Sequence, residues 1–159
     1  MNSIDRLLQE ADQVLLIDWP GEDCPRALLR AGFGVFGQEP TGWLRYELKH
    51  YHLQKHALAA PPPRVDLVFC YRPVEELSEY LATAQRLSAK VFCYQSGLVS
   101  PSTEYLRGCW LSDDVRNKVR RMVEDAGLIY IDEVYIGDAV RAMDICKVRQ
   151  PLIDPAISS

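Results

Sequence analysis

No Cys-x-x-Cys pair occurs in this sequence, although it contains five cysteines. An odd number of widely spaced cysteines does not complete a disulfide framework, and a zinc knuckle needs closely paired thiols. Cys70 and Cys93 stand near the ends of two similar apolar runs, which suggests that they lie side by side in a sheet. We expect the cysteines to be small buried thiols in a reducing compartment.

Long apolar runs are also missing. Nowhere does the chain reach the roughly 18 apolar residues that a membrane-spanning helix needs, and residues 1–6 lack the basic-then-apolar pattern of an export signal. The net charge of −4 provides no general excess of Lys and Arg to neutralise nucleic-acid phosphates. We therefore expect a cytoplasmic protein that binds neither membranes nor nucleic acids.

Familiar catalytic motifs are absent as well. The sequence contains no Gly-x-Ser-x-Gly elbow, no His-Glu-x-x-His helix and no Gly-x-x-x-x-Gly-Lys-Ser/Thr loop. Two alternatives stay open: a metal site at His50, His52 and His56, and a nucleophilic Cys24 at a helix start, which its acidic neighbours oppose. These absences favour a binding protein over an enzyme, with no catalytic residues and no metal.

What the sequence does contain is an alternation of strand and helix patterns. A chain of 159 residues that is 48% hydrophobic is long enough for one domain over 1–159, with a core at about 14–132. Apolar runs predict strands at 14–17, 33–37, 65–70, 91–94 and 128–131, and amphipathic spacing predicts helices at 4–11, 25–31, 74–87 and 112–126. This order predicts an α/β fold with three layers: a Rossmann-like, doubly wound parallel sheet of about five strands, covered by helices on both faces.

Three segments do not follow this alternation. Within 38–63, residues 41–53 alternate enough in polarity to predict an edge strand or a hairpin. Residues 100–111 are irregular, and 143–159 read as an extended strap or as an end that seeks a partner. The glycines of the second strand weaken it or mark a close approach to its backbone.

Polar residues follow two of the predicted strands. Arg72 and Pro73 end one apolar run, and Gln95, Ser96 and Gly97 end the next. Because the carboxyl ends of parallel strands meet at one edge of a sheet, where ligands of open α/β sheets bind, we expect a site here. Arg72 either grips a phosphate or carboxylate, or forms a structural salt bridge with Glu75 or Glu76.

Four short motifs carry a resemblance to a known family. They are Ala-Gly-Phe-Gly-Val-Phe at 31–36, Val-Asp-Leu-Val at 65–68 with Tyr-Arg-Pro at 71–73, Val-Phe-Cys-Tyr-Gln-Ser-Gly-Leu-Val at 91–99, and Ala-Gly-Leu-Ile-Tyr-Ile-Asp at 126–132. In order and spacing the chain resembles the small stand-alone coenzyme A-binding proteins, Rossmann-like domains akin to the nucleotide-binding part of the succinyl-CoA synthetase α subunit. The resemblance implies a non-enzymatic module that binds coenzyme A, acyl-CoA or a related nucleotide.

The turn after the first strand departs from that family. A Gly-Ala-Ser type turn there normally lets backbone N–H groups reach a pyrophosphate. Here the turn is Asp18-Trp-Pro-Gly-Glu-Asp-Cys24, with three carboxylates, and the prolines at 20 and 25 remove donors. One carboxylate–phosphate pair at ~5 Å costs roughly 3 kcal/mol at an effective dielectric constant near 20. Phosphate affinity therefore needs an offset from Arg26 or Arg72. A further departure is Glu133-Val134, where the family has an Arg-Cys pair after the last strand.

The predicted ligand-binding residues are Asp18, Trp19, Gly21, Arg26, Tyr71, Arg72, Pro73, Gln95, Ser96 and Gly97. Asp18 either binds a ribose hydroxyl or caps the helix that follows. Gln95 and Ser96 suit the amides of pantetheine, unless this tip is only a turn that needs Gly97. The alternative function is a degenerate Rossmann domain without nucleotide that serves in self-association, as a homodimer, or in protein interaction.

Overall fold

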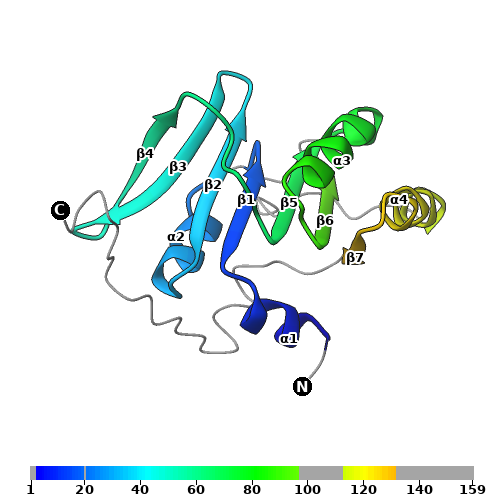
Figure 1. Ribbon diagram of the computed structural model, residues 1–159, viewed down its shortest axis with the longest axis horizontal. Helices are drawn as coiled ribbons and strands as arrows, with labels where there is room; N and C mark the ends of the chain where they lie inside the picture. Colours follow the sequence, from blue (N-terminus) through cyan, green and yellow to red (C-terminus); the bar gives the residue numbers. More distant parts are fainter. Residues whose placement is uncertain (1–2, 20, 97–112, 132–159) are drawn as a thin grey trace.

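A single seven-stranded sheet organises the molecule. In the computed structural model, which describes residues 3–19, 21–96 and 113–131, the strand order is β4-β3-β2-β1-β5-β6-β7 (Figure 1). The strands are β1 (Gln13–Ile17), β2 (Gly34–Glu39), β3 (Gly42–Lys49), β4 (His52–Leu58), β5 (Leu67–Arg72), β6 (Val91–Ser96) and β7 (Ile129–Ile131).

The sheet is mixed. β2, β1, β5, β6 and β7 are parallel neighbours, whereas β3 and β4 are antiparallel and extend the sheet beyond β2. The sheet therefore has more strands than the predicted parallel sheet of about five, and it is not entirely parallel. The segment 38–63 supplies the two further strands because its alternating residues form a hairpin, one of the two structures expected there.

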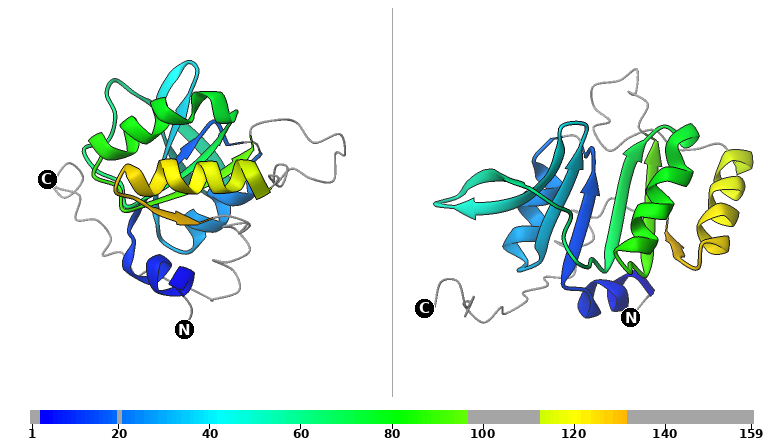
Figure 2. Two further views of the ribbon diagram at one scale, coloured as in Figure 1. Left: turned by 90° about the vertical axis from the view of Figure 1, so that its right-hand side faces the viewer. Right: turned by 45° about the horizontal axis from the view of Figure 1, so that its top comes forward.

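Helices cover both faces of the sheet, as predicted. They are α1 (Ser3–Glu10), α2 (Asp23–Arg30), α3 (Leu77–Arg86) and α4 (Asp113–Asp125), with a short 3-10 helix η1 (Val74–Glu76) before α3. Leu8 of α1 and Leu28 of α2 pack on one face, and Leu81 of α3 and Val119 of α4 pack on the other (Figure 2). Residues of β1 alternate between these two clusters and are buried from Val14 to Ile17, as expected for a strand covered on both sides.

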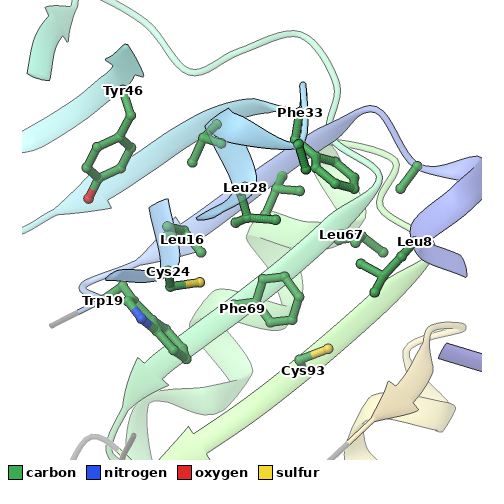
Figure 3. Packing of buried hydrophobic residues seen from close by; sticks show 14 of the residues in the cluster. Leu8, Leu16, Trp19, Cys24, Leu28, Phe33, Tyr46, Leu67, Phe69 and Cys93 are labelled. Atoms are coloured by element: carbon green, nitrogen blue, oxygen red, sulfur yellow. The ribbon is translucent and has the colours of Figure 1, made fainter. Parts of the chain in front are cut away.

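The cluster beneath α1 and α2 is built around aromatic and branched side chains. Phe69 lies at its centre with Leu16, Leu28 and Leu67 around it (Figure 3). Full burial of side chains of this size contributes about 1.5–3 kcal/mol each, so the cluster is a main source of stability.

The described cysteines are all buried, at positions 24, 70 and 93, whereas Cys109 and Cys146 lie outside the described residues. The expectation that Cys70 and Cys93 lie side by side is wrong. Cys70 is opposite Tyr94 and Cys93 is opposite Phe69, so a one-residue offset sends the two thiols to opposite faces of the sheet. Burial raises the pKa of the Cys70 thiol, which makes it unreactive.

The β3–β4 hairpin turns through residues in the left-handed region. His50 and Tyr51 have φ angles of 52° and 67°, the sign that a two-residue type I′ turn requires at both positions. At the other end of β3, a Cβ on Gly37 would lie 2.8 Å from the Leu44 Cδ1. The glycine in β2 therefore does mark a close approach, and the approaching group is a side chain of the hairpin.

Within the described ranges, no helix has the length and apolar character to span a membrane, and no group of three or more metal-ligating side chains comes together. The segments 100–111 and 143–159 lie outside those ranges.

Candidate functional site

The chain leaves β1 toward β2 on one side and later places β5 on the other side, so the strand order reverses at β1. In open α/β sheets such a reversal opens a crevice at the carboxyl ends of the strands. A cavity of about 320 Å³ lies there, and we call it the edge pocket. It is lined by Asp18, Gln38, Glu39, Pro40, Arg72, Glu76, Glu79 and Tyr80.

Arg72 is the central cation of the edge pocket. Its Nη1 donates to Asp18 Oδ2 at 2.7 Å, its Nη2 donates to Glu76 Oε2 at 2.7 Å, and its Nε donates to Glu76 Oε1 at 3.2 Å. These bonds, from Glu76 first and then from Asp18, raise the pKa of the guanidinium further above its ordinary value. The structural salt bridge considered for Arg72 is therefore present, with Glu76 rather than Glu75, and it extends to Asp18.

Asp18 has an unusual backbone that places it in the pocket. Its φ angle is 49°, and its N–H donates to the Gln38 carbonyl at 2.8 Å, across the gap between β1 and β2. The helix cap considered for Asp18 is wrong, because α2 begins after Glu22, which makes no side-chain capping bond, and Pro25 is the third residue of that helix. Asp18 instead binds Arg72.

The backbone of Arg72 is fixed from the next strand. Tyr94 Oη donates to the Arg72 carbonyl at 2.7 Å, and burial raises the pKa of this phenol. The hydroxyl therefore stays protonated and remains a donor at neutral pH. This bond and the pair with Asp18 hold the guanidinium between β1 and α3.

Negative charge predominates around the pocket. It is lined by the carboxylates of Asp18, Glu39, Glu76 and Glu79, and by one guanidinium. Lys55 partly offsets them by pairing with Glu39 at 3.0 Å, although the side chain of Lys55 is half exposed. A diphosphate in the pocket would therefore meet repulsion that a single, already paired Arg72 does not remove.

Gln38 presents a buried acceptor at the pocket wall. Its side-chain oxygen is inaccessible to solvent and accepts no hydrogen bond from the described residues. Leaving a buried polar atom unpaired costs about 1–3 kcal/mol, so a rotation of the Gln38 side chain that pairs this oxygen with a donor would be favourable.

Gln38, Glu39 and Tyr80 are pocket residues that the sequence prediction missed. The second strand was expected to end at 37, whereas β2 continues to Glu39 and carries both residues to the carboxyl edge. An acidic residue about 20 positions after the first turn, at the end of the second strand, is the signal that would have identified Glu39.

Trp19 and Tyr71 lie away from the pocket lining. Trp19 is 7% exposed and belongs to the core beneath α2, with its ring edge-on to that of Phe69 at a centroid distance of 6.2 Å (Figure 3). The Trp19 ring is also edge-on to that of Tyr71, at a centroid distance of 5.6 Å. Gly21, at a φ of 74°, has no atom near the position of a Cβ, and Pro73 precedes η1. None of these four predicted residues lines the pocket: Trp19 and Tyr71 pack in or against the core, and Gly21 and Pro73 lie in loops.

The remaining predicted residues are Arg26 and the strand tip 95–97. Arg26 pairs with Glu22 at 2.7 Å and donates to the Tyr51 carbonyl at 2.8 Å. It therefore neutralises one carboxylate of the acidic turn and braces the hairpin, but it does not line the edge pocket. The backbone of Ser96 lies opposite Arg72 and that of Gln95 opposite Tyr71, so the two strand tips are neighbours as expected. Gly97 lies outside the described residues.

Two solved structures resemble this chain in fold, at low sequence identity. A Thermus thermophilus protein described as cell-free ID.343 superposes with a TM-score of 0.58 at 17% sequence identity, over 90% of this chain and 99% of that one. Prb, the PH1109 protein redesigned for binding, superposes with a TM-score of 0.54 at 16% identity, over 92% of this chain and 94% of that one. No protein-family model and no curated protein sequence matches this chain. At these identities the two structures show that the chain has an α/β fold.

Proposed function

We propose that this protein is a non-enzymatic, Rossmann-like module that binds a nucleotide-type small molecule in the edge pocket, with coenzyme A or acyl-CoA as the leading candidates. The observation that carries the proposal is the position of the pocket at the reversal of strand order, where open α/β sheets bind their ligands. The unpaired acceptor on Gln38 supports it, because a rotation of this pocket-lining side chain would pair its oxygen with a ligand donor.

The charges of the pocket decide which part of such a ligand enters. Glu39 stands at the end of β2, where a carboxylate accepts hydrogen bonds from ribose hydroxyls in dinucleotide-binding folds. Ribose hydroxyls, the adenine amino group and pantetheine amides all donate hydrogen bonds, whereas a diphosphate only accepts them. We therefore place a nucleoside or pantetheine end in the pocket and the diphosphate outside it, toward solvent.

Thermal melting with a set of ligand fragments tests this proposal. The set is coenzyme A, acetyl-CoA, adenosine, pantetheine and pyrophosphate. A ligand at about 100 times its Kd stabilises the folded protein by roughly 2.7 kcal/mol. We expect stabilisation by coenzyme A and by adenosine or pantetheine, and none by pyrophosphate. No stabilisation by any coenzyme A species at millimolar concentration would remove the proposal.

A substitution at Gln38 separates binding from folding. Gln38→Leu removes the unpaired acceptor, so the ligand-free protein should be as stable as the wild type or more stable, while the stabilisation by ligand falls. Gln54→Leu in β4 is the matched control, because Gln54 does not line the pocket. Equal ligand stabilisation in both variants would show that the ligand binds elsewhere.

A further inference from the structure

Over β2, β3 and β4, one face of the sheet has no covering helix among residues 3–19, 21–96 and 113–131. On this face α3 and α4 lie over the strands from β5 to β7, and none of the described helices lies over the other three (Figure 2). The alternation of side chains along these strands directs one set of residues to this face. The set is Phe36, Trp43, Arg45, Glu47, His56 and Leu58, which we call the open sheet face.

The open sheet face changes character along the hairpin. Phe36 and Trp43 are partly buried against the core near the edge pocket, whereas Arg45 and His56 are exposed farther out. The hairpin as a whole, residues 42–58, carries three Lys or Arg, all three histidines of the chain and one acidic residue. It is therefore a cationic arm on a protein whose net charge is −4.

The tip of this arm presents an aromatic side chain to solvent. Tyr51 is 84% exposed, the highest value among the large hydrophobic side chains of the described residues. Its backbone is held in place, because the Arg26 guanidinium donates to the Tyr51 carbonyl at 2.8 Å. A fixed, exposed aromatic residue is typical of contact surfaces, where Tyr is enriched.

Acidic residues of η1 and α3 border the open sheet face at the end away from the hairpin tip. Glu75, Glu76 and Glu79 lie in η1 and the first turn of α3, and that helix has no basic residue before Arg86. Glu75 and Glu79 are exposed, and Glu79 lines the edge pocket together with residues of the β2–β3 connection. The acidic edge of α3 is thus on the same side of the sheet as Arg45 and His56 of the cationic arm.

We infer that the open sheet face and the acidic edge of α3 together bind a second copy of this chain. A two-fold axis requires one surface to be complementary to itself, and here both signs of charge flank the partly exposed side chains of Phe36, Trp43 and Leu58. The cationic arm of each copy lies against the acidic edge of α3 in the other. Burial of these three side chains contributes to association, and the charges fix the register.

Sedimentation of the full-length chain without ligand tests this inference, so its outcome is independent of the proposed ligand. We expect a monomer–dimer equilibrium that weakens at high salt. Arg45→Glu and Glu79→Arg should each raise the dissociation constant at least about tenfold, and the double variant R45E/E79R should recover most of that loss because the complementary signs are restored. Arg30→Glu, an exposed charge reversal on α2, is the matched control and should leave the constant unchanged.

Two results would overturn the inference. One is a monomer at every concentration and at low salt. The other is a dimer that both charge reversals leave intact, as edge-to-edge pairing of β4 would give. Circular dichroism of each variant checks that it folds. Tyr51→Ser, a change at an exposed side chain, provides a variant that keeps the fold and should weaken the dimer, and an unchanged dimer in this variant also contradicts the proposed arm contact.

Discussion

The two ends of the sheet differ in how completely they are covered. β5 and β6 have helices on one face and the cluster beneath α1 and α2 on the other, and their residues from Leu67 to Cys70 and from Val91 to Tyr94 are buried. None of the helices in the described part of the chain covers β3 and β4 on the side of α3, and these two strands have only two buried residues, Leu44 and Tyr46 in β3. The covered end therefore holds the fold together, while polar and exposed groups gather at the other end and at the junction between them.

The largest expected loss of stability comes from removing a buried side chain at the covered end of the sheet. Phe92 in β6 is fully buried, so Phe92→Ala should lower the free energy of unfolding by about 3–5 kcal/mol. Trp43→Ala on the open sheet face should cost clearly less, because that ring already contacts solvent. Urea denaturation of both variants measures the difference, and equal losses would show that the two ends contribute alike.

Substitution of Asp66 tests the interactions at the amino edge of the sheet, opposite the edge pocket. Its Oδ2 accepts the N–H groups of Asp12 and Gln13 at 2.9 and 3.0 Å. Burial alone would raise the pKa of Asp66, but these bonds, together with the nearby charges of Arg64 and Lys90, lower it. Asp66→Ala should lower the free energy of unfolding by about 1–3 kcal/mol at neutral pH.

The pH dependence of this effect has a definite sign. A lowered folded-state pKa stabilises the protein above the unfolded pKa of about 4, and the stabilisation is lost as pH falls through the folded value. Asp66→Asn keeps an acceptor without the charge. The stability advantage of the wild type over this variant should therefore shrink in acid, and an advantage that is independent of pH would contradict the titration of Asp66.

Substitution of the two carboxylates that pair with Arg72 should change stability little and anion binding more. The double variant Asp18→Asn with Glu76→Gln weakens partly exposed ion pairs, which should cost about 1 kcal/mol. It also releases the guanidinium and removes two negative charges from the pocket. We expect pyrophosphate to stabilise the double variant more than the wild type in thermal melting. No gain would show that these carboxylates do not control anion binding.

The smallest expected effect is at the tip of the hairpin. His50 and Tyr51 adopt the left-handed conformation without being glycine, whereas Asn-Gly is the preferred pair for this turn. His50→Asn with Tyr51→Gly should raise the free energy of unfolding by about 0.5–1 kcal/mol. Thermal unfolding measures it, and a loss of stability would mean that the exposed Tyr51 ring contributes to the monomer.

Much of the fold could be predicted, because burial on both faces leaves continuous apolar runs such as those of β1 and β5. The hairpin was harder, since a one-sided strand with exposed positions, such as β4, carries a weaker pattern. At the site, Arg72 and the neighbouring strand tips follow from the rule that parallel strands end at one edge. The pairing of Asp18 with Arg72 and the role of Gln38 depend on contacts between distant segments and on one residue with positive φ, which periodicity does not encode.

One measurement can show whether ligand binds in the edge pocket. Amide chemical shifts of the ¹⁵N-labelled protein, followed during titration with coenzyme A, test this most directly. We expect the largest changes at Asp18, Gln38, Glu39, Arg72 and Tyr80, and we expect Gln38→Leu to weaken them. An absence of changes at millimolar coenzyme A, or changes confined to residues far from this pocket, would contradict binding in the edge pocket.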